Sequence, residues 1–190
     1  LQIENEFYGT IRPKRTVQRG ERPLHALRER GVEYVEVRLM DINPFESMGI
    51  SAQTMRLLDV FLLHCLLSDS PADSPAEIAE MKHNQHMAAE RGREPGLQLQ
   101  RNGQAVTLTQ WGAEILEACK PIAAALDAAH GVQDYSLALA HAQSLLSHPE
   151  QTPSAQVLAA VQNEFDGRFK AFGIAQSQIA RAETLQRPWS

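Results

Sequence analysis

The chain has 190 residues, of which 43% are hydrophobic and 22% are charged, and its formal net charge is −5. This composition is ordinary for a folded domain with a hydrophobic core, and it excludes disorder as the dominant state. A nucleic-acid partner is not expected, because binding a phosphate backbone requires clustered Lys and Arg. No membrane segment is expected either, since the most apolar run, Val60–Leu67, is far shorter than the roughly 20 residues of a membrane span.

The two cysteines predict a reduced, cytoplasmic protein. Cys65 and Cys119 lie far apart, lack CxxC spacing and each sit within an apolar helical pattern, so both are interpreted as unpaired core thiols. The chain begins at Leu1 without an initiator Met or a signal sequence. We therefore expect it to be a piece of a longer protein.

The first 45 residues are predicted to be extended or looped. Residues 1–8 alternate polar and apolar side chains, which indicates an extended segment. Residues 12–31 are rich in charged and turn-forming side chains and predict a loop that can hold a short helix at Leu24–Arg30. The best strand is Val32–Leu39, which is dense in β-branched and aromatic side chains.

From Ser51 onward the apolar residues follow a helical period. They fill most of the circumference of residues 51–67, so this helix is expected to be buried on most sides. Ser74-Pro75-Ala76-Glu77 is a capping box that predicts a second helix reaching about Arg91. Asn102-Gly103 favours a type I′ turn, which predicts a small β-hairpin at Leu97–Leu108.

Three further helices are predicted after the hairpin. The first spans Gln110–His130, where Pro121 is expected to introduce a kink and Gly131 to end the helix. The other two are expected at Gln133–Ser147 and Ser154–Phe172. The chain is thus α+β, with a sheet-forming part at residues 1–50 and a helical region with the hairpin at residues 51–190, both within one domain.

One face of the predicted strand carries the chemistry. Tyr34, Glu36 and Arg38 share that face, whereas the apolar residues between them share the opposite face, which can pack on helices. The polar face would place a carboxylate and a guanidinium about 7 Å apart. This pair suits Mg²⁺ binding and phosphoryl chemistry. Spacing alone favours the alternative, a solvent-exposed ion pair on an amphipathic strand.

Four segments weigh against that alternative. Residues 1–8 (LQIENEFY), 11–15 (IRPKR), 32–38 (VEYVEVR) and 41–45 (DINPF) resemble, in order and spacing, consecutive motifs of the proteobacterial-type glutamate–cysteine ligases. The resemblance is to the C-terminal part of these enzymes. It continues more thinly through residues 55–67 and the turn at residues 92–97, and fades after Ala125.

The resemblance implies the fold, the activity and the site residues. The fold would be the C-terminal part of a glutamine-synthetase-like catalytic domain. The activity would be ATP-dependent ligation of the glutamate γ-carboxylate to the amine of cysteine through γ-glutamyl phosphate, the first step of glutathione biosynthesis. By motif position, Glu36 is implied as a metal (Mg²⁺) ligand, Arg38 as a catalytic residue that steadies the transferring phosphoryl group, and Tyr8 as part of the cysteine pocket.

The resemblance also implies what the chain lacks. The family's other metal-binding glutamates lie N-terminal to the segment that corresponds to Leu1. The chain would need that missing N-terminal portion to bind glutamate, cysteine and ATP productively, so we expect it to be inactive alone. The alternatives are a non-catalytic helical interaction module derived from this fold, or a related carboxylate–amine ligase with another amine substrate.

Several other polar residues are predicted to have structural roles, and one basic group has two possible roles. Glu4 and Glu6 are interpreted as edge-strand charges, the pair His83 and His86 as surface histidines rather than metal ligands, and His64 as a core histidine. The basic group Arg12, Lys14 and Arg15 either faces phosphates or an acidic substrate, or forms a solvated loop.

Overall fold

The computed structural model describes residues 10–38 and 40–187. The chain separates into two compact units, Leu1–Ile42 and Asn43–Ser190. The expected extended segment at residues 1–8, with Glu4, Glu6 and Tyr8, lies outside the described residues. The expected division of a single domain at residue 50 stays a prediction.

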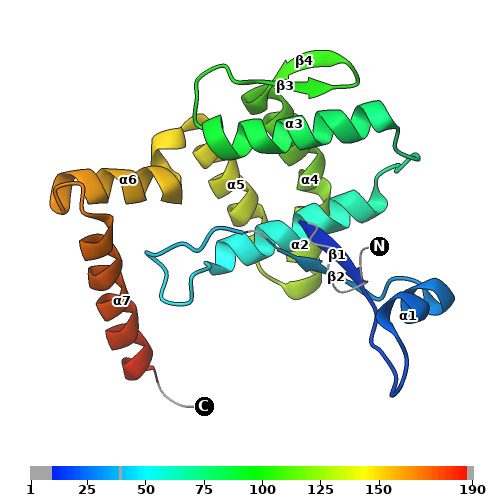
Figure 1. The fold of residues 1–190 in the computed structure, drawn as a ribbon, viewed down its shortest axis with the longest axis horizontal. Helices are drawn as coiled ribbons and strands as arrows, with labels where there is room; N and C mark the ends of the chain where they lie inside the picture. The colour runs from blue at the N-terminus through cyan, green and yellow to red at the C-terminus, as the bar shows by residue number, and fades with distance from the viewer. Residues whose placement is uncertain (1–9, 39, 188–190) are drawn as a thin grey trace. The chain divides into compact units, whose positions relative to one another are not determined.

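The first unit holds a two-stranded antiparallel ribbon and a short helix (Figure 1). Strand β1 (Ile11–Lys14) pairs with β2 (Tyr34–Val37), and Arg12 lies opposite Glu36. Helix α1 (Pro23–Arg30) begins with a proline, whose missing N–H costs nothing in the first turn, and ends at Gly31 with a φ of 71°. The predicted strand and the short helix are both confirmed, although the strand is shorter than expected.

The expectation that residues 12–14 belong to a loop is wrong, because Ile11–Lys14 form a strand. The amide of Arg38 donates to the Thr10 carbonyl at 2.8 Å, and the amide of Glu33 donates to the Lys14 carbonyl at 2.9 Å. A proline is tolerated in β1, since the ribbon has two strands among the described residues and each keeps one edge unpaired. A four-residue segment that contains proline has no period from which a strand can be predicted.

The second unit is built on three helices that pack together. Helices α2 (Ala52–Leu67), α4 (Leu108–His130) and α5 (Asp134–Ser147) contact one another and enclose a buried cluster. Its fully or nearly buried members are Val60, Cys119, Ala123 and Leu139. Helix α2 begins where the Ser51 hydroxyl accepts from the Thr54 amide at 3.0 Å, an ordinary N-cap.

Helix α2 is not buried on most sides, contrary to expectation. Val60 is completely buried, but Leu66 and Leu67 are 77% and 75% exposed. The reason is that α4 and α5 cover one side of this helix only. An apolar sequence all round a helix indicates burial in the complete fold, and the described residues supply part of that burial.

Helix α3 (Pro75–Arg91) and the hairpin formed by β3 (Gln98–Arg101) and β4 (Gln104–Thr107) agree with the sequence. The amide of Glu77 donates to the Ser74 hydroxyl at 3.2 Å, which confirms the predicted cap. Asn102 and Gly103 have φ values of 54° and 74°, as a type I′ turn requires. A second buried cluster, formed by Leu97, Leu99 and Val106, joins the hairpin to the helices.

The C-terminal region contains two helices where one was expected. The short 3-10 helix η2 (Pro149–Gln151) leads into α6 (Pro153–Glu164), and α7 (Phe169–Gln186) follows after a break (Figure 1). Asp166 and Gly167 have φ values of 51° and 75° at the break. Left-handed backbone at two successive residues cannot continue a right-handed helix. None of the helices described by the structure is long and apolar enough to cross a membrane.

Candidate functional site

The β1–β2 ribbon gathers charged side chains on one face. Since residues opposite each other on paired strands point to the same side, Arg12 and Lys14 of β1 share a face with Tyr34 and Glu36 of β2. Arg38, two residues beyond Glu36, continues the same alternation. The side chains of the four charged residues are half-buried, so this face is partly shielded from water.

Glu36 lies between two cations on this ribbon face. Its Oε2 is 2.9 Å from Lys14 Nζ, and its Oε1 is 3.4 Å from Arg38 Nε. The hydrogen bond from Lys14 and the surrounding positive charges lower the pKa of Glu36 below its usual range. The carboxylate is therefore ionised at neutral pH, and its side chain has bent to meet Arg38, so the expected separation of about 7 Å does not apply to the charged atoms.

The opposite face of the ribbon carries apolar side chains, and its expected packing on helices stays a prediction. Ile11 and Val35 on that face are 44% and 42% exposed. On the charged face, the ion pair between Lys14 and Glu36 joins the two strands.

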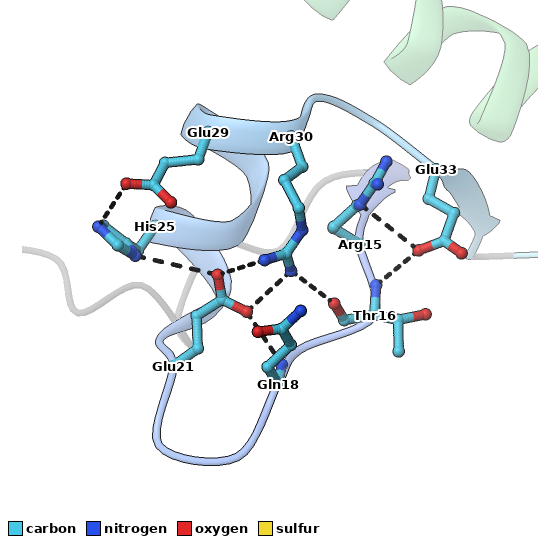
Figure 2. A network of polar contacts seen from close by, with 8 residues as sticks. All are labelled: Arg15, Thr16, Gln18, Glu21, His25, Glu29, Arg30 and Glu33. Carbon is cyan, nitrogen blue, oxygen red and sulfur yellow. Dashed lines mark hydrogen bonds and ion pairs between the residues drawn. The ribbon is translucent and has the colours of Figure 1, made fainter.

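A separate network ties the loop between the two strands to α1 (Figure 2). The two terminal nitrogens of Arg30 donate to the Glu21 carboxylate at 2.9 and 2.8 Å, and one of them also donates to the Thr16 carbonyl at 3.0 Å. The Glu33 carboxylate accepts from the Thr16 amide at 2.9 Å and lies 3.6 Å from Arg15 Nε. These bonds fix the loop from β1 to α1 beside the start of β2.

Glu21, His25 and Glu29 bring possible metal-ligand atoms within 4.8 Å of one another. Figure 2 shows that His25 lies between the two carboxylates, with nitrogen–oxygen distances of 3.9 Å to Glu21 and 3.1 Å to Glu29. Arg30 already occupies both oxygens of Glu21, and its positive charge disfavours a cation there. The group is thus an ion-pair network of the loop, and the spacing of four residues between its members is the sequence signal that could have revealed it.

The histidines that the sequence predicts not to bind a metal can be checked where the structure describes them. His83 and His86 are exposed and belong to no cluster of three possible ligands in the part of the chain that the structure describes. His64 is half-buried rather than a core histidine, and its Nδ1 lies 3.5 Å from the Ser68 hydroxyl. Both cysteines are free, but Cys119 alone is buried, so the expectation of a core position is wrong for Cys65.

Comparisons with known proteins show which proteins this chain is similar to. Residues 1–88 match the family described as glutamate-cysteine ligase. The glutamate–cysteine ligase of Azotobacter vinelandii is 48% identical over 186 residues, which cover 98% of this chain and 35% of the relative. That of Janthinobacterium sp. (strain Marseille) is 51% identical over 183 residues, which cover 96% of this chain and 34% of the relative. The chain is a homologue of bacterial glutamate–cysteine ligases.

The ligase fold is confirmed as well. The crystal structure of glutamate–cysteine ligase from Francisella tularensis in complex with AMP matches with a TM-score of 0.86 and 33% identity, over 98% of this chain and 36% of that chain. The expected α+β fold of these ligases, with a few antiparallel strands followed by a mainly helical region, is therefore correct. The similarity also extends well beyond Ala125, where the motifs of the sequence fade, and the chain spans about a third of the length of the relatives it matches.

The similarity to these ligases raises the question whether Glu36 can bind Mg²⁺. Glu36 offers hard carboxylate oxygens of the kind that Mg²⁺ prefers, but it is the only carboxylate on this ribbon face among the described residues. Mg²⁺ requires about six oxygen ligands in octahedral geometry. Glu36 therefore fits as one ligand, and the described residues do not by themselves form a complete magnesium site.

Proposed function

We propose that this chain is part of a longer ATP-dependent ligase that joins the γ-carboxylate of glutamate to the amine of cysteine through γ-glutamyl phosphate. The observation that carries the proposal is the ionised Glu36 held between Lys14 and Arg38 on the β1–β2 ribbon, within the segment that matches the ligase family. This reaction would be the first step of glutathione biosynthesis, and the enzyme would act in the cytoplasm.

Glu36 would supply one oxygen ligand to Mg²⁺ in the complete enzyme. When bound, the metal would neutralise negative charge on the phosphates of ATP. The remaining ligands would come from the portion of the longer chain that this sequence does not include. The two cations beside Glu36 keep its carboxylate ionised, and one of them would have to give way to the metal.

Arg38 would contact the phosphoryl group that passes from ATP to glutamate. Its guanidinium is permanently charged and can donate two parallel hydrogen bonds to phosphate oxygens. The side chain is 36% exposed and its Nε lies 3.4 Å from Glu36, so the guanidinium and the metal-binding carboxylate act at the same point. Tyr8 would line the pocket for cysteine, an assignment that rests on its motif position.

The decisive experiment is γ-glutamylcysteine formation by the full-length product of the parent gene, with glutamate, cysteine, ATP and Mg²⁺. The wild-type protein should form product, and Glu36→Gln should lower kcat/KM by at least about 100-fold, because a neutral amide cannot replace a carboxylate as a ligand. Glu29→Gln, which alters an exposed carboxylate of α1, is the matched control and should keep its activity.

Two outcomes would count against the proposal. If the well-folded wild-type protein forms no product with cysteine, a screen of other amines decides between a ligase with a different acceptor and a non-catalytic interaction module. If Glu36→Gln keeps full activity, Glu36 is not a metal ligand. The purified 190-residue chain should show no turnover, since Glu36 is one of several carboxylates that would bind Mg²⁺ in the complete enzyme.

A further inference from the structure

The positive charges on the charged face of the ribbon outnumber its single carboxylate. Arg12, Lys14 and Arg38 face the single acid Glu36, so three positive charges minus one negative charge leave a local excess of two. The chain as a whole has a net charge of −5. A local reversal of sign on a half-buried face is what a polyanionic ligand requires.

Lys14 occupies the carboxylate oxygen that a metal would need. Its Nζ lies 2.9 Å from Oε2 of Glu36, while Arg38, which follows directly after the strand of Glu36, contacts the other oxygen. With a cation at each oxygen, Glu36 can accept a metal only after one cation has moved. Lys14 is suited to move, because a lysine is a point charge on a flexible four-carbon stem and this side chain is 33% exposed.

We propose that Lys14 is a phosphate-binding residue of the nucleotide site. Without nucleotide, its ammonium group neutralises Glu36; when metal and ATP bind, the ammonium leaves the carboxylate for oxygens of the β- and γ-phosphates. In this exchange no charge is left without a partner, since the metal replaces the ammonium at Glu36 as the ammonium reaches the phosphate. This inference rests on the proposed function, because it takes ATP as the nucleotide.

The position of Lys14 favours the outer phosphates. Lys14 and Arg38 both contact Glu36, at 2.9 and 3.4 Å, so their charged ends lie around one point. If Arg38 contacts the transferring phosphoryl group, Lys14 reaches the same group or its neighbour. AMP lacks the β- and γ-phosphates. If Lys14 contacts these phosphates, replacing Lys14 should therefore weaken the binding of ATP and not that of AMP.

The test is nucleotide binding by the full-length protein, measured by titration calorimetry with ATP and with AMP in the presence of Mg²⁺. Lys14→Met, which keeps the length of the stem and removes the charge, should weaken ATP binding by about 10-fold and AMP binding by less than about 2-fold. Lys14→Arg should restore most of the ATP affinity. The control Lys120→Met alters another ion-paired lysine, 2.5 Å from Glu117, and should change neither affinity.

A second measurement separates phosphate binding from support of Glu36. Mn²⁺ binding without nucleotide should be at least as tight in Lys14→Met as in the wild type, because the carboxylate has lost a competing cation. Loss of Mn²⁺ and ATP binding together would show that Lys14 only positions Glu36, and would overturn the inference. Unchanged ATP affinity, or equal losses for ATP and AMP, would overturn it as well.

Failure of the proposed function and failure of the inference about Lys14 can be told apart by the two assays. A wild-type protein that binds ATP but forms no γ-glutamylcysteine would defeat the proposed function, and the comparison of ATP with AMP in Lys14→Met would still report on Lys14. A wild-type protein that binds no ATP would defeat both.

Discussion

Asp127 connects two helices through its carboxylate. It lies near the end of α4 and accepts from the amides of Tyr135 and Ser136, at 2.9 and 3.0 Å. These amides belong to the first turn of α5, where they have no partner within the helix. Burial raises the pKa of Asp127, but the hydrogen bonds from Ser136 and Tyr135 outweigh burial, and the net pKa is lower than usual.

Asp127→Asn should lower Tm by roughly 2–5 °C at pH 7, because an amide can accept one of these bonds but turns its NH₂ toward the other donor. Because folding lowers the pKa, the stabilisation by Asp127 is complete above the ordinary Asp pKa of about 3.9 and is lost as pH falls through the lower folded value. The difference in Tm between wild type and variant should therefore shrink below about pH 4. Asp69→Asn, an exposed loop residue, is the control; an equal difference at pH 3 and pH 7 would contradict this account.

At the scale of elements, Asn84 joins helix α3 to the hairpin. Its Nδ2 donates to the Gln100 carbonyl at 2.6 Å, and its Oδ1 accepts from the Gln100 amide at 2.8 Å. The side chain therefore pairs with the edge of β3 as a neighbouring strand would. Glu80 on the same helix accepts from the Gly103 amide at the hairpin turn, at 2.8 Å, so α3 holds both the edge and the turn.

Asn84→Leu should destabilise the protein by about 2 kcal/mol, because it leaves both main-chain groups of a half-buried residue without a partner. Hydrogen exchange at the Gln100 amide should accelerate more than exchange within α2, since the lost bonds belong to the hairpin. Gln85→Leu changes an exposed amide on the same helix and should leave both quantities unchanged. Exchange that rises equally throughout the chain would refute a local role.

At the scale of the second unit as a whole, α7 anchors the turn that begins the unit. The ring of Phe172, which is 2% exposed, meets Phe45 edge-on at 6.0 Å and also packs against Phe165 and Phe169. Arg187 donates to the hydroxyl of Ser47 in the same turn. Two contacts thus tie the end of the unit to its start, across more than 120 residues of sequence.

Phe172→Ala should cost about 3 kcal/mol, the lower part of the usual range for a buried Phe, because the neighbouring rings are partly exposed and can relax into the space. The turn at residues 43–49 and helix α7 should both become more sensitive to limited proteolysis. Phe169→Ala removes a ring that is 66% exposed and should cost much less. Equal proteolysis of the wild type and Phe172→Ala would show that the aromatic contact does not hold the turn.

The sequence by itself determined the features that depend on neighbours three or four positions apart. The caps at Ser74 and Gly131, the hairpin turn at Asn102-Gly103 and most helix bounds are of this kind, because the partners of each backbone group are local. Alternation along β2 likewise placed Glu36 and Arg38 on one face. The family motifs added their roles, which stay proposals until the experiments above are made.

Only the tertiary structure decided what lies opposite those residues. Lys14 meets Glu36 because β1 pairs with β2 across a loop and a helix. Arg30 rather than a metal fills the Glu21 carboxylate because α1 brings its last residue back to the loop before the helix. Strand register and ion pairs between distant segments depend on the free energy of the folded arrangement, which no local pattern encodes. The break before α7 and the exposed side of α2 were likewise set by packing, since an apolar pattern shows that a residue can be buried and not which element covers it.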